Sequence, residues 1–330
     1  MYESKIVNIT RESGIPLVGS VFIGILDRGS SLLQVRPTTL CNMSCTFCST
    51  DAGINSRFHK TNFIVDPGYL LEELKKVSEE KGYNLHYNID SVGEPTSYPY
   101  LIELIKGIKQ FPDVLKISMQ TNGTLLSKEL IDNLVSAGLD RLNISVHSLD
   151  SLKAKMLFGS ENYNIEKVIE IIDYIKNTSL ELWLTPVWIQ KINDNDIIEL
   201  IKFAKQHSLN IGLQKYETYK YSRKIKKARE LNYWKFYNQL EKWEKEFDIK
   251  LKFKNDPTIT KRKTIKKMFE VDDKLQAVVV SKGWFPDQGI AAAKERAITV
   301  NNCNSNIHDK INIKIIENKN NIYLAELIRK

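Results

Sequence analysis

Residues 31–48 read SLLQVRPTTLCNMSCTFC, a β-rich run followed at once by three cysteines. Cys41, Cys45 and Cys48 have the spacing C-x3-C-x2-C, and the remaining cysteine, Cys303, lies near the other end of the chain. A secreted scaffold spreads an even set of cysteines for disulfides, whereas an intracellular cluster at short spacing is typical of a metal site. The sequence therefore predicts that three thiolates project together from a loop directly after a strand.

The flanking sequence alternates β-rich runs with amphipathic runs. The runs expected to be strands are 31–40, 85–92, 115–122, 141–148, 180–189 and 210–217. Apolar residues at three- and four-residue spacing predict helices over 69–80, 100–109, 128–137, 165–176 and 194–207. Repeated βα units predict a parallel sheet, either open and doubly wound or closed into an incomplete barrel. In both architectures the carboxyl ends of the strands carry the chemistry, which is where the cysteines stand.

The composition describes a globular chain and excludes fibres and disorder. Its 330 residues are 42% hydrophobic and 27% charged. The longest mostly apolar run, residues 15–26, is too short to span a bilayer. The amino terminus, MYESKIVNIT, has no basic region followed by an apolar core, as a secretory signal would. We therefore expect a cytoplasmic protein with no membrane association. We also expect a monomer.

Positive charge is concentrated in one segment. The formal net charge is +8, and seventeen Lys or Arg stand against six Asp or Glu between Lys220 and Lys267. A local excess of this size suits a polyanion such as RNA, although a solvated helical face is the alternative. An aromatic stripe over 233–247 is expected to pack inward from a helix over 222–247, because its members recur at helical spacing. Only the basic side of this helix is then a candidate binding surface.

Three cysteines are one too few for a closed site, since structural zinc and four-iron electron-transfer clusters each take four protein ligands. The stretch 41–48, with Phe47 directly before the third cysteine, resembles the signature of the radical S-adenosylmethionine (SAM) superfamily. The overall resemblance is to uncharacterised archaeal members of it. A zinc site completed by a histidine such as His59, or chance, is the alternative.

That resemblance implies a [4Fe-4S] cluster on Cys41, Cys45 and Cys48, with SAM on the fourth iron. One electron from the cluster would cleave SAM to methionine and a 5′-deoxyadenosyl radical, which abstracts hydrogen from the substrate. A low-potential donor such as a ferredoxin would supply the electron. The single remaining cysteine, Cys303, cannot build a second cluster or a pair of catalytic thiols, so a structural role is expected for it.

The resemblance also implies SAM contacts at the ends of later strands. The run Val92-Gly93-Glu94-Pro95 is similar to the Gly-Gly-Glu motif of the family, with Val92 in place of the first glycine. A structural role is the alternative for His147. Lys215 and Glu217, on the last strand, are the candidates for catalysis on the substrate side. The expected cofactor contacts are Phe47, Gly93, Glu94, Pro95, Thr121, Asn122, Ser145, His147, Val187 and Gln214.

From residue 271 onward, short β-like runs alternate with Gly and Asn, which predicts a small all-β barrel. This segment resembles a TRAM domain, the OB-like barrel of several RNA-modifying enzymes. Alternatively, the barrel only stabilises the end of the chain. The candidates for RNA contact are Lys224, Lys226, Lys227, Arg229, Lys261, Arg262, Lys263, Lys282, Trp284, Phe285, Lys294 and Arg296.

These interpretations together give one expected organisation. It comprises a hairpin-like extension over 1–30, a partial (β/α)6 TIM-like barrel of the radical SAM type over 31–220, a basic helical extension over 221–270 and a TRAM-like barrel over 271–330. Such a chain is expected to modify a nucleotide in tRNA or rRNA. Two alternatives stay open: a radical SAM enzyme that acts on a protein or peptide, and an RNA-binding protein without catalysis.

Overall fold

The computed structural model describes residues 5–59, 61–253 and 259–328, which divide into two compact units. The first unit is discontinuous in sequence and combines residues 1–40, 57–117 and 258–330. The second unit combines residues 41–56 and 118–257. The three cysteines of the short-spaced cluster therefore belong to the second unit, and the small C-terminal barrel belongs to the first.

The α/β part of the first unit is built from β2 (Gly24–Asp27), β3 (Leu32–Arg36) and β5 (Leu85–Ile89). Strand β3 pairs antiparallel with β2 and parallel with β5, while β1 (Lys5–Ile9) runs parallel to β4 (Thr61–Val65). The helices are α1 (Pro67–Lys81) and α2 (Leu101–Lys109), which pack on each other. Helix α1 begins sharply because the Asp66 side chain accepts from the backbone N–H of Tyr69 and Pro67 occupies its first turn.

A buried ion pair fastens the segment 259–270 to this sheet. Lys81 Nζ lies 2.9 Å from Asp27 Oδ1 and donates to the carbonyl of Lys263, while Asp27 Oδ2 accepts from Ile265 N. Both charged side chains are buried, so each is compensated by the other and by backbone groups. Residues 259–270 are therefore an extended strap, and the expected helical extension over 221–270 was wrong for this part.

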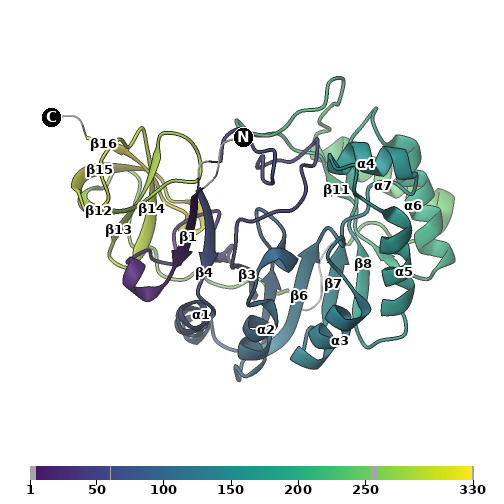
Figure 1. The fold of residues 1–330 in the computed structure, drawn as a ribbon, viewed down its shortest axis with the longest axis horizontal. Coiled ribbons are helices and arrows are strands. Elements are labelled where there is room, and N and C mark those ends of the chain that lie inside the picture. The colour runs from purple at the N-terminus through teal and green to yellow at the C-terminus, as the bar shows by residue number, and fades with distance from the viewer. Residues whose placement is uncertain (1–4, 60, 254–258, 329–330) are drawn as a thin grey trace. The chain divides into compact units, whose positions relative to one another are not determined.

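The C-terminal segment forms a closed five-stranded barrel, which is compatible with the expected OB-like fold. Its strands are β12 (Lys274–Lys282), β13 (Gln288–Ala293), β14 (Arg296–Asn301), β15 (Lys310–Glu317) and β16 (Leu324–Leu327), drawn in yellow-green in Figure 1. They close in the order β12-β13-β14-β16-β15, with only β14 and β16 parallel. The apolar run 289–300 is two strands, because Lys294 and Glu295 both adopt positive φ and turn the chain between them.

Residues 17–24 fold against this barrel within the first unit. The carbonyls of Val18 and Gly19 accept from the backbone N–H groups of Ala297 and Tyr323. The Phe22 ring lies 5.5 Å from the Trp284 ring. The chain before β2 is therefore integrated with the barrel, and β1 pairs with β4 instead of folding into the expected hairpin.

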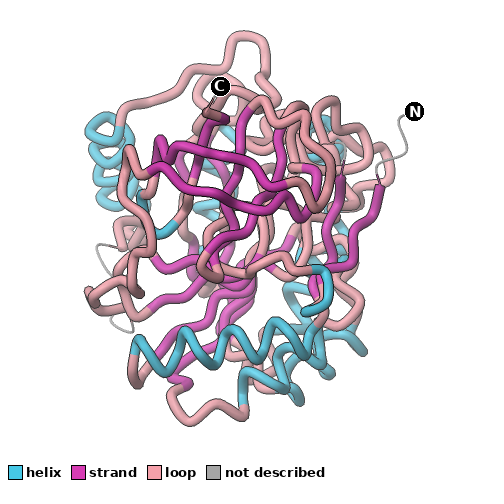
Figure 2. The backbone as a smooth tube through the Cα atoms, turned by 90° about the vertical axis from the view of Figure 1, so that its left-hand side faces the viewer, coloured by secondary structure: helices cyan, strands magenta, loops and turns pink. Residues whose placement is uncertain are grey.

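The second unit is a parallel sheet with helices between its strands. Its strand order is β10 (Asn210–Ile211), β8 (Glu181–Leu184), β7 (Arg141–Ile144) and the end of β6 (Val114–Thr121). A separate pair joins β9 (Val187–Trp188) and β11 (Gln214–Lys215). The helices are α3 (Lys128–Ala137), α4 (Ser151–Phe158), α5 (Ile165–Ile175), α6 (Asp194–Gln206) and α7 (Tyr233–Phe247), in cyan in Figure 2.

All five helices expected from hydrophobic periodicity are confirmed to within two residues at each end. The structure adds α4, and α7 begins only at Tyr233, where Asn232 caps it, so the expected helix over 222–232 was wrong. Of the aromatic stripe, Phe236, Leu240 and Trp243 are buried, but Trp234 is 71% exposed. The expectation that the whole stripe packs inward is therefore corrected. No helix among the described residues is both long and apolar enough to cross a membrane.

Candidate functional site

The three clustered cysteines lie on one tightly held loop of the second unit, residues 41–56, here called the cysteine loop. Its backbone is tied to the end of α4, since Ser44 N and Thr46 N donate to the carbonyls of Phe158 and Leu157. Gly53 has φ 106°, and a Cβ there would lie only 1.6 Å from the carbonyl oxygen of Met43. Only glycine fits this crossing, so the loop has a fixed path.

An amide network joins the cysteine loop to the residues after β6. Asn122 Nδ2 donates to Asn42 Oδ1 over 2.9 Å, and Asn42 Nδ2 donates to Thr124 Oγ1 over 2.8 Å. Asn122, predicted as a SAM contact, is buried, and its Oδ1 accepts from Thr124 N. Thr121, also predicted, is buried, and its Oγ1 accepts from Gly123 N. In this structure both side chains shape the loop ends, and Asn42 is a site residue that the sequence did not single out.

Arg223 holds the cysteine loop from the opposite side. Its Nε lies 2.7 Å from Asp51 Oδ1, and its terminal nitrogens donate to the carbonyls of Cys45, Asp51 and Ala52 at 2.7 to 3.2 Å. Its own backbone N–H donates to the carbonyl of Cys48. The side chain of Asp51 is 1% exposed. Sequence reasoning counted Arg223 only as charge in the basic run, whereas it is the central clamp of this loop.

The chemistry of the thiols fits an iron–sulfur cluster. All three are partly exposed, and Cys48 Sγ lies 3.4 Å from Thr50 Oγ1. Burial raises the pKa of Cys45 well above its ordinary value, and negative charge on Cys41 and Cys48 raises it further. The described residues offer no ready group of three His, Cys, Asp or Glu side chains for a single metal ion. A four-iron cluster asks for a wider arrangement, because each thiolate binds a different iron.

Phe47 and His147 pack together behind the loop. Their ring centroids are 4.7 Å apart, and His147 also lies 4.9 Å from Phe158. His147 is buried, and its Nδ1 accepts from the backbone N–H of Val187. Nearby, Gln120 Nε2 donates to Ser145 Oγ over 2.9 Å. These contacts support the structural alternative for His147. Val187, which was predicted as a SAM contact, contacts His147 through its backbone N–H.

Burial lowers the pKa of His147 to about 3, while an unfolded chain has a histidine pKa near ~6.5. Between these values the unfolded state binds a proton that the folded state does not, so folding stability falls as the pH drops. We expect His147 to contribute a loss of up to about 1.4 kcal/mol per pH unit below pH ~6.5. Urea unfolding of the His147→Gln variant should show a shallower pH dependence than the wild type. The same change at exposed His308 should leave the pH dependence intact, and equal slopes for both variants would contradict the assignment.

The candidates on the last strand form a network of their own. Lys215 Nζ lies 3.2 Å from Glu217 Oε1 and 4.9 Å from the centre of the Tyr233 ring. Glu217 accepts from the hydroxyls of Tyr233 and Tyr219, which lowers its pKa. Gln214 is exposed, and its backbone N–H donates to Pro186 O. The structure therefore brings Lys215 and Glu217 together, each held by the other and by tyrosines.

The Gly93-Glu94-Pro95 turn of the first unit is built around Leu40, the residue before Cys41. A Cβ on Gly93 would lie 2.1 Å from the carbonyl oxygen of Leu40, and Glu94 N donates to that oxygen. The Glu94 side chain is buried and accepts from Thr96 N and Oγ1. This close approach gives a physical reason for glycine at position 93, and it fixes the entry to the cysteine loop.

The expected RNA contacts divide into exposed and engaged side chains. Arg262 donates to the carbonyl of Lys81 and lies over the Tyr83 ring, and Arg296 donates to the carbonyl of Lys266. Trp284 is buried, with its ring centroid 3.9 Å from that of His59, so it is no part of an exposed face, which corrects that expectation. Phe285 is half-buried. The exposed candidates are Lys224, Lys226, Lys227, Arg229, Lys261, Lys263, Lys282 and Lys294, of which Lys282 donates to the carbonyl of Ser305 and Lys294 lies over the Phe269 ring.

Comparison with known proteins gives one family match. The family described as the Radical SAM superfamily matches residues 35–204. An uncharacterised protein of Methanocaldococcus jannaschii is 34% identical, over 95% of this chain and 79% of that protein. The GTP 3′,8-cyclase of Aquifex aeolicus is 29% identical over 58% of each chain, so the match spans little more than half of that enzyme.

Two solved structures share the fold over 67% of this chain. Streptococcus suis SuiB has a TM-score of 0.52 at 20% identity, with 48% of its chain covered. A radical SAM methyltransferase from Sphaerobacter thermophilus has a TM-score of 0.51 at 18% identity, with 65% of its chain covered. These similarities establish the fold of the α/β part.

Proposed function

Because the chain belongs to the radical SAM superfamily, whose members bind SAM and a [4Fe-4S] cluster, we propose that it modifies a nucleotide of an RNA by radical chemistry. In this proposal Cys41, Cys45 and Cys48 hold the cluster. The observation that supports this assignment is the cysteine loop, whose path is fixed by contacts within the chain. Arg223, the side chains of Asn122 and Thr124, and the backbone of α4 all hold it.

The residues of the second unit prepare the site for its cofactor. The bound cluster would supply one electron to SAM, which breaks a carbon–sulfur bond and yields the 5′-deoxyadenosyl radical. Phe47 and neutral His147 form an apolar wall behind the loop, which excludes water from that side. Burial raises the pKa of Cys45, and the positive charge of Arg223 partly offsets that rise.

The closed barrel supports RNA as the substrate class. Barrels of this kind bind oligonucleotides through the second and third strands and the loops beside them. Here those strands are β13 and β14. Exposed Lys282 is the last residue of β12, directly before the β12–β13 loop, and exposed Lys294 lies in the turn between β13 and β14. In the second unit, Lys224, Lys226 and Lys227 are exposed on the loop that also carries Arg223. Cations at these places suit contact with phosphates.

Reductive cleavage of SAM and RNA modification are tested in one experiment. Anaerobically reconstituted protein, with dithionite and SAM, is incubated with RNA from cells that lack the gene. We expect deoxyadenosine, a higher yield of it with RNA than without, and a mass shift in one nucleoside. Reconstituted protein that yields no deoxyadenosine would contradict the catalytic proposal. Stimulation by a peptide pool but not by RNA would favour the peptide alternative.

Salt dependence tests the electrostatic part of the proposal. We expect the affinity for single-stranded RNA, measured by fluorescence anisotropy, to fall about tenfold or more between about 50 and 200 mM salt, because cations released from the phosphates drive binding. The exposed lysines on the 224–227 loop and on the barrel are expected to make the phosphate contacts that cause this salt dependence. An affinity that stays constant over this range would contradict phosphate contacts.

A further inference from the structure

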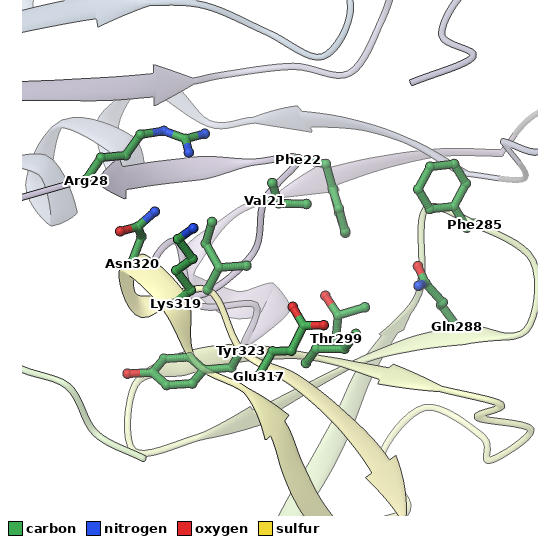
Figure 3. Close-up of a pocket in the computed structure, with 12 residues that line it drawn as sticks. Val21, Phe22, Arg28, Phe285, Gln288, Thr299, Glu317, Lys319, Asn320 and Tyr323 are labelled. Carbon is green, nitrogen blue, oxygen red and sulfur yellow. The ribbon is translucent and has the colours of Figure 1, made fainter. Parts of the chain in front are cut away.

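A pocket of about 350 Å³ opens on the barrel of the first unit (Figure 3). One wall comes from the chain on either side of β2, with Phe22 before the strand and Arg28 directly after it. The barrel supplies the rest: Phe285 from the β12–β13 loop, Thr299 from β14, and Lys319 from the β15–β16 turn. All of these residues lie in one compact unit, so the pocket does not depend on the placement of the other.

The pocket owes its size to the N-terminal segment. Residues 18 and 19 are bonded to Ala297 and Tyr323, so this segment covers part of the face that β14 and the β15–β16 turn present. What stays open is a concavity instead of a long groove. Its volume is at the lower end of the range for small-molecule sites, which suits one nucleotide and not several.

The lining differs from one end to the other, and the Glu317 carboxylate and Thr299 lie between the two ends (Figure 3). Phe285 and Gln288 lie at one end. The Phe285 ring can stack on a base, and the Gln288 amide can form hydrogen bonds with the edge of that base. Arg28, Lys319 and Asn320 stand at the other end, where two cations suit a phosphate. A nucleotide matches this arrangement with its base at the first end, a sugar hydroxyl that can donate to the Glu317 carboxylate in the middle, and its phosphate at the second end.

Buried hydrogen bonds hold the turn that carries the phosphate end. Asn321 is buried, donates to the carbonyl of Ile265 over 2.8 Å, and accepts from the Tyr323 hydroxyl over 2.6 Å. Arg28 is oriented by Gln34, whose Oε1 accepts from its Nε. Preorganised cations lose less conformational entropy on binding, which favours a specific site over diffuse attraction.

We propose that this pocket binds one nucleotide of a single-stranded RNA, with its base at Phe285 and Gln288 and its phosphate at Arg28 and Lys319. The inference rests on the proposed function and goes beyond it, because it names a site for an RNA nucleotide on the barrel. The same chemistry is present in a free nucleoside 5′-monophosphate. The experiment therefore measures both kinds of ligand.

The test compares Lys319→Gln with Lys310→Gln in the full-length protein. Each variant removes one positive charge from an exposed lysine on the barrel, but only Lys319 lines the pocket. For short single-stranded RNA, we expect Lys319→Gln to reduce the slope of log affinity against log salt by about 0.7, the share of one phosphate contact, and Lys310→Gln to leave it unchanged. Phe285→Ala should weaken binding about 5-fold or more through lost stacking.

The outcomes separate the pocket from the function on which it rests. Equal effects of Lys319→Gln and Lys310→Gln, with no effect of Phe285→Ala, would overturn the pocket while RNA binding by the wild type stands. Wild-type binding of adenosine 5′-monophosphate but not of RNA, lost in Lys319→Gln, would support the pocket as a nucleotide site and contradict the RNA function. Unchanged thermal unfolding of each variant shows that the fold is intact.

Discussion

Replacing Cys45 with alanine is expected to abolish reductive cleavage of SAM. It should also weaken the affinity for the cluster by at least about 100-fold, so the reconstituted protein should contain less iron. Cys45 is the middle thiol of the three, and the backbone on both sides of it is fixed by α4 and Arg223. Those backbone contacts survive in the variant, so the loss would come from the missing thiolate. Iron analysis and deoxyadenosine yield measure the two effects.

Cys303→Ala is the matched control for this prediction. Cys303 is buried in the apolar core of the barrel, among Val279, Ile313 and Tyr323. Its truncation is expected to cost about 1 kcal/mol of stability through a small cavity, with full iron content and full cleavage of SAM. A Cys45→Ala protein that still held four irons and yielded deoxyadenosine would refute the ligand assignment. A Cys303→Ala protein without iron would give Cys303 a role that its core position does not suggest.

Replacing Arg223 with methionine is expected to destabilise the second unit by about 3–5 kcal/mol, because it removes the guanidinium that pairs with the buried Asp51 carboxylate. It also removes the donors to the carbonyls of Cys45, Asp51 and Ala52. The cysteine loop should then open in the metal-free protein. Hydrogen exchange of peptides from residues 41–56 should rise sharply, and iron uptake should fall.

Three further variants make this prediction specific. Lys224→Met removes the neighbouring, exposed cation and should leave stability and hydrogen exchange unchanged. Arg223→Lys keeps the charge but not the fork of donors, so it should recover only part of the loss. Adding Asp51→Asn to Arg223→Met removes the buried charge and should restore stability without closing the loop. If Arg223→Met and Lys224→Met behave alike, the clamp has no role.

Local patterns in the sequence were enough to predict the regular elements of the α/β part. The helices α1, α2, α3, α5 and α6 were found because each carries apolar residues at three- and four-residue spacing, which gives it one apolar face. Helix α4 was missed because its eight residues do not gather their apolar side chains on one face. The run 180–189 was expected as one strand, but Pro186 lacks a backbone N–H and separates β8 from β9.

Contacts between distant segments were beyond what the sequence could show. The pairing of β1 with β4 joins runs more than fifty residues apart and leaves no local signal. Arg223 looked like one of many exposed cations, and only the tertiary structure reveals that it turns onto the cysteine loop. Trp284 looked like an RNA-stacking residue for the same reason, although it packs on His59 and Phe22. The cysteine spacing, in contrast, is purely local, so its interpretation needed no fold.

The discontinuous first unit has a consequence for biosynthesis. Val18 and Gly19 leave the ribosome long before Ala297 and Tyr323, the residues that bond to them. At about 5–20 residues per second, the wait lasts about 15–60 s, during which Phe22 and its neighbours lack their native cover. The nascent chain therefore depends on holding factors or on non-native burial of this segment until the barrel is made. Translation speed over the last third of the message should then influence the yield of native protein.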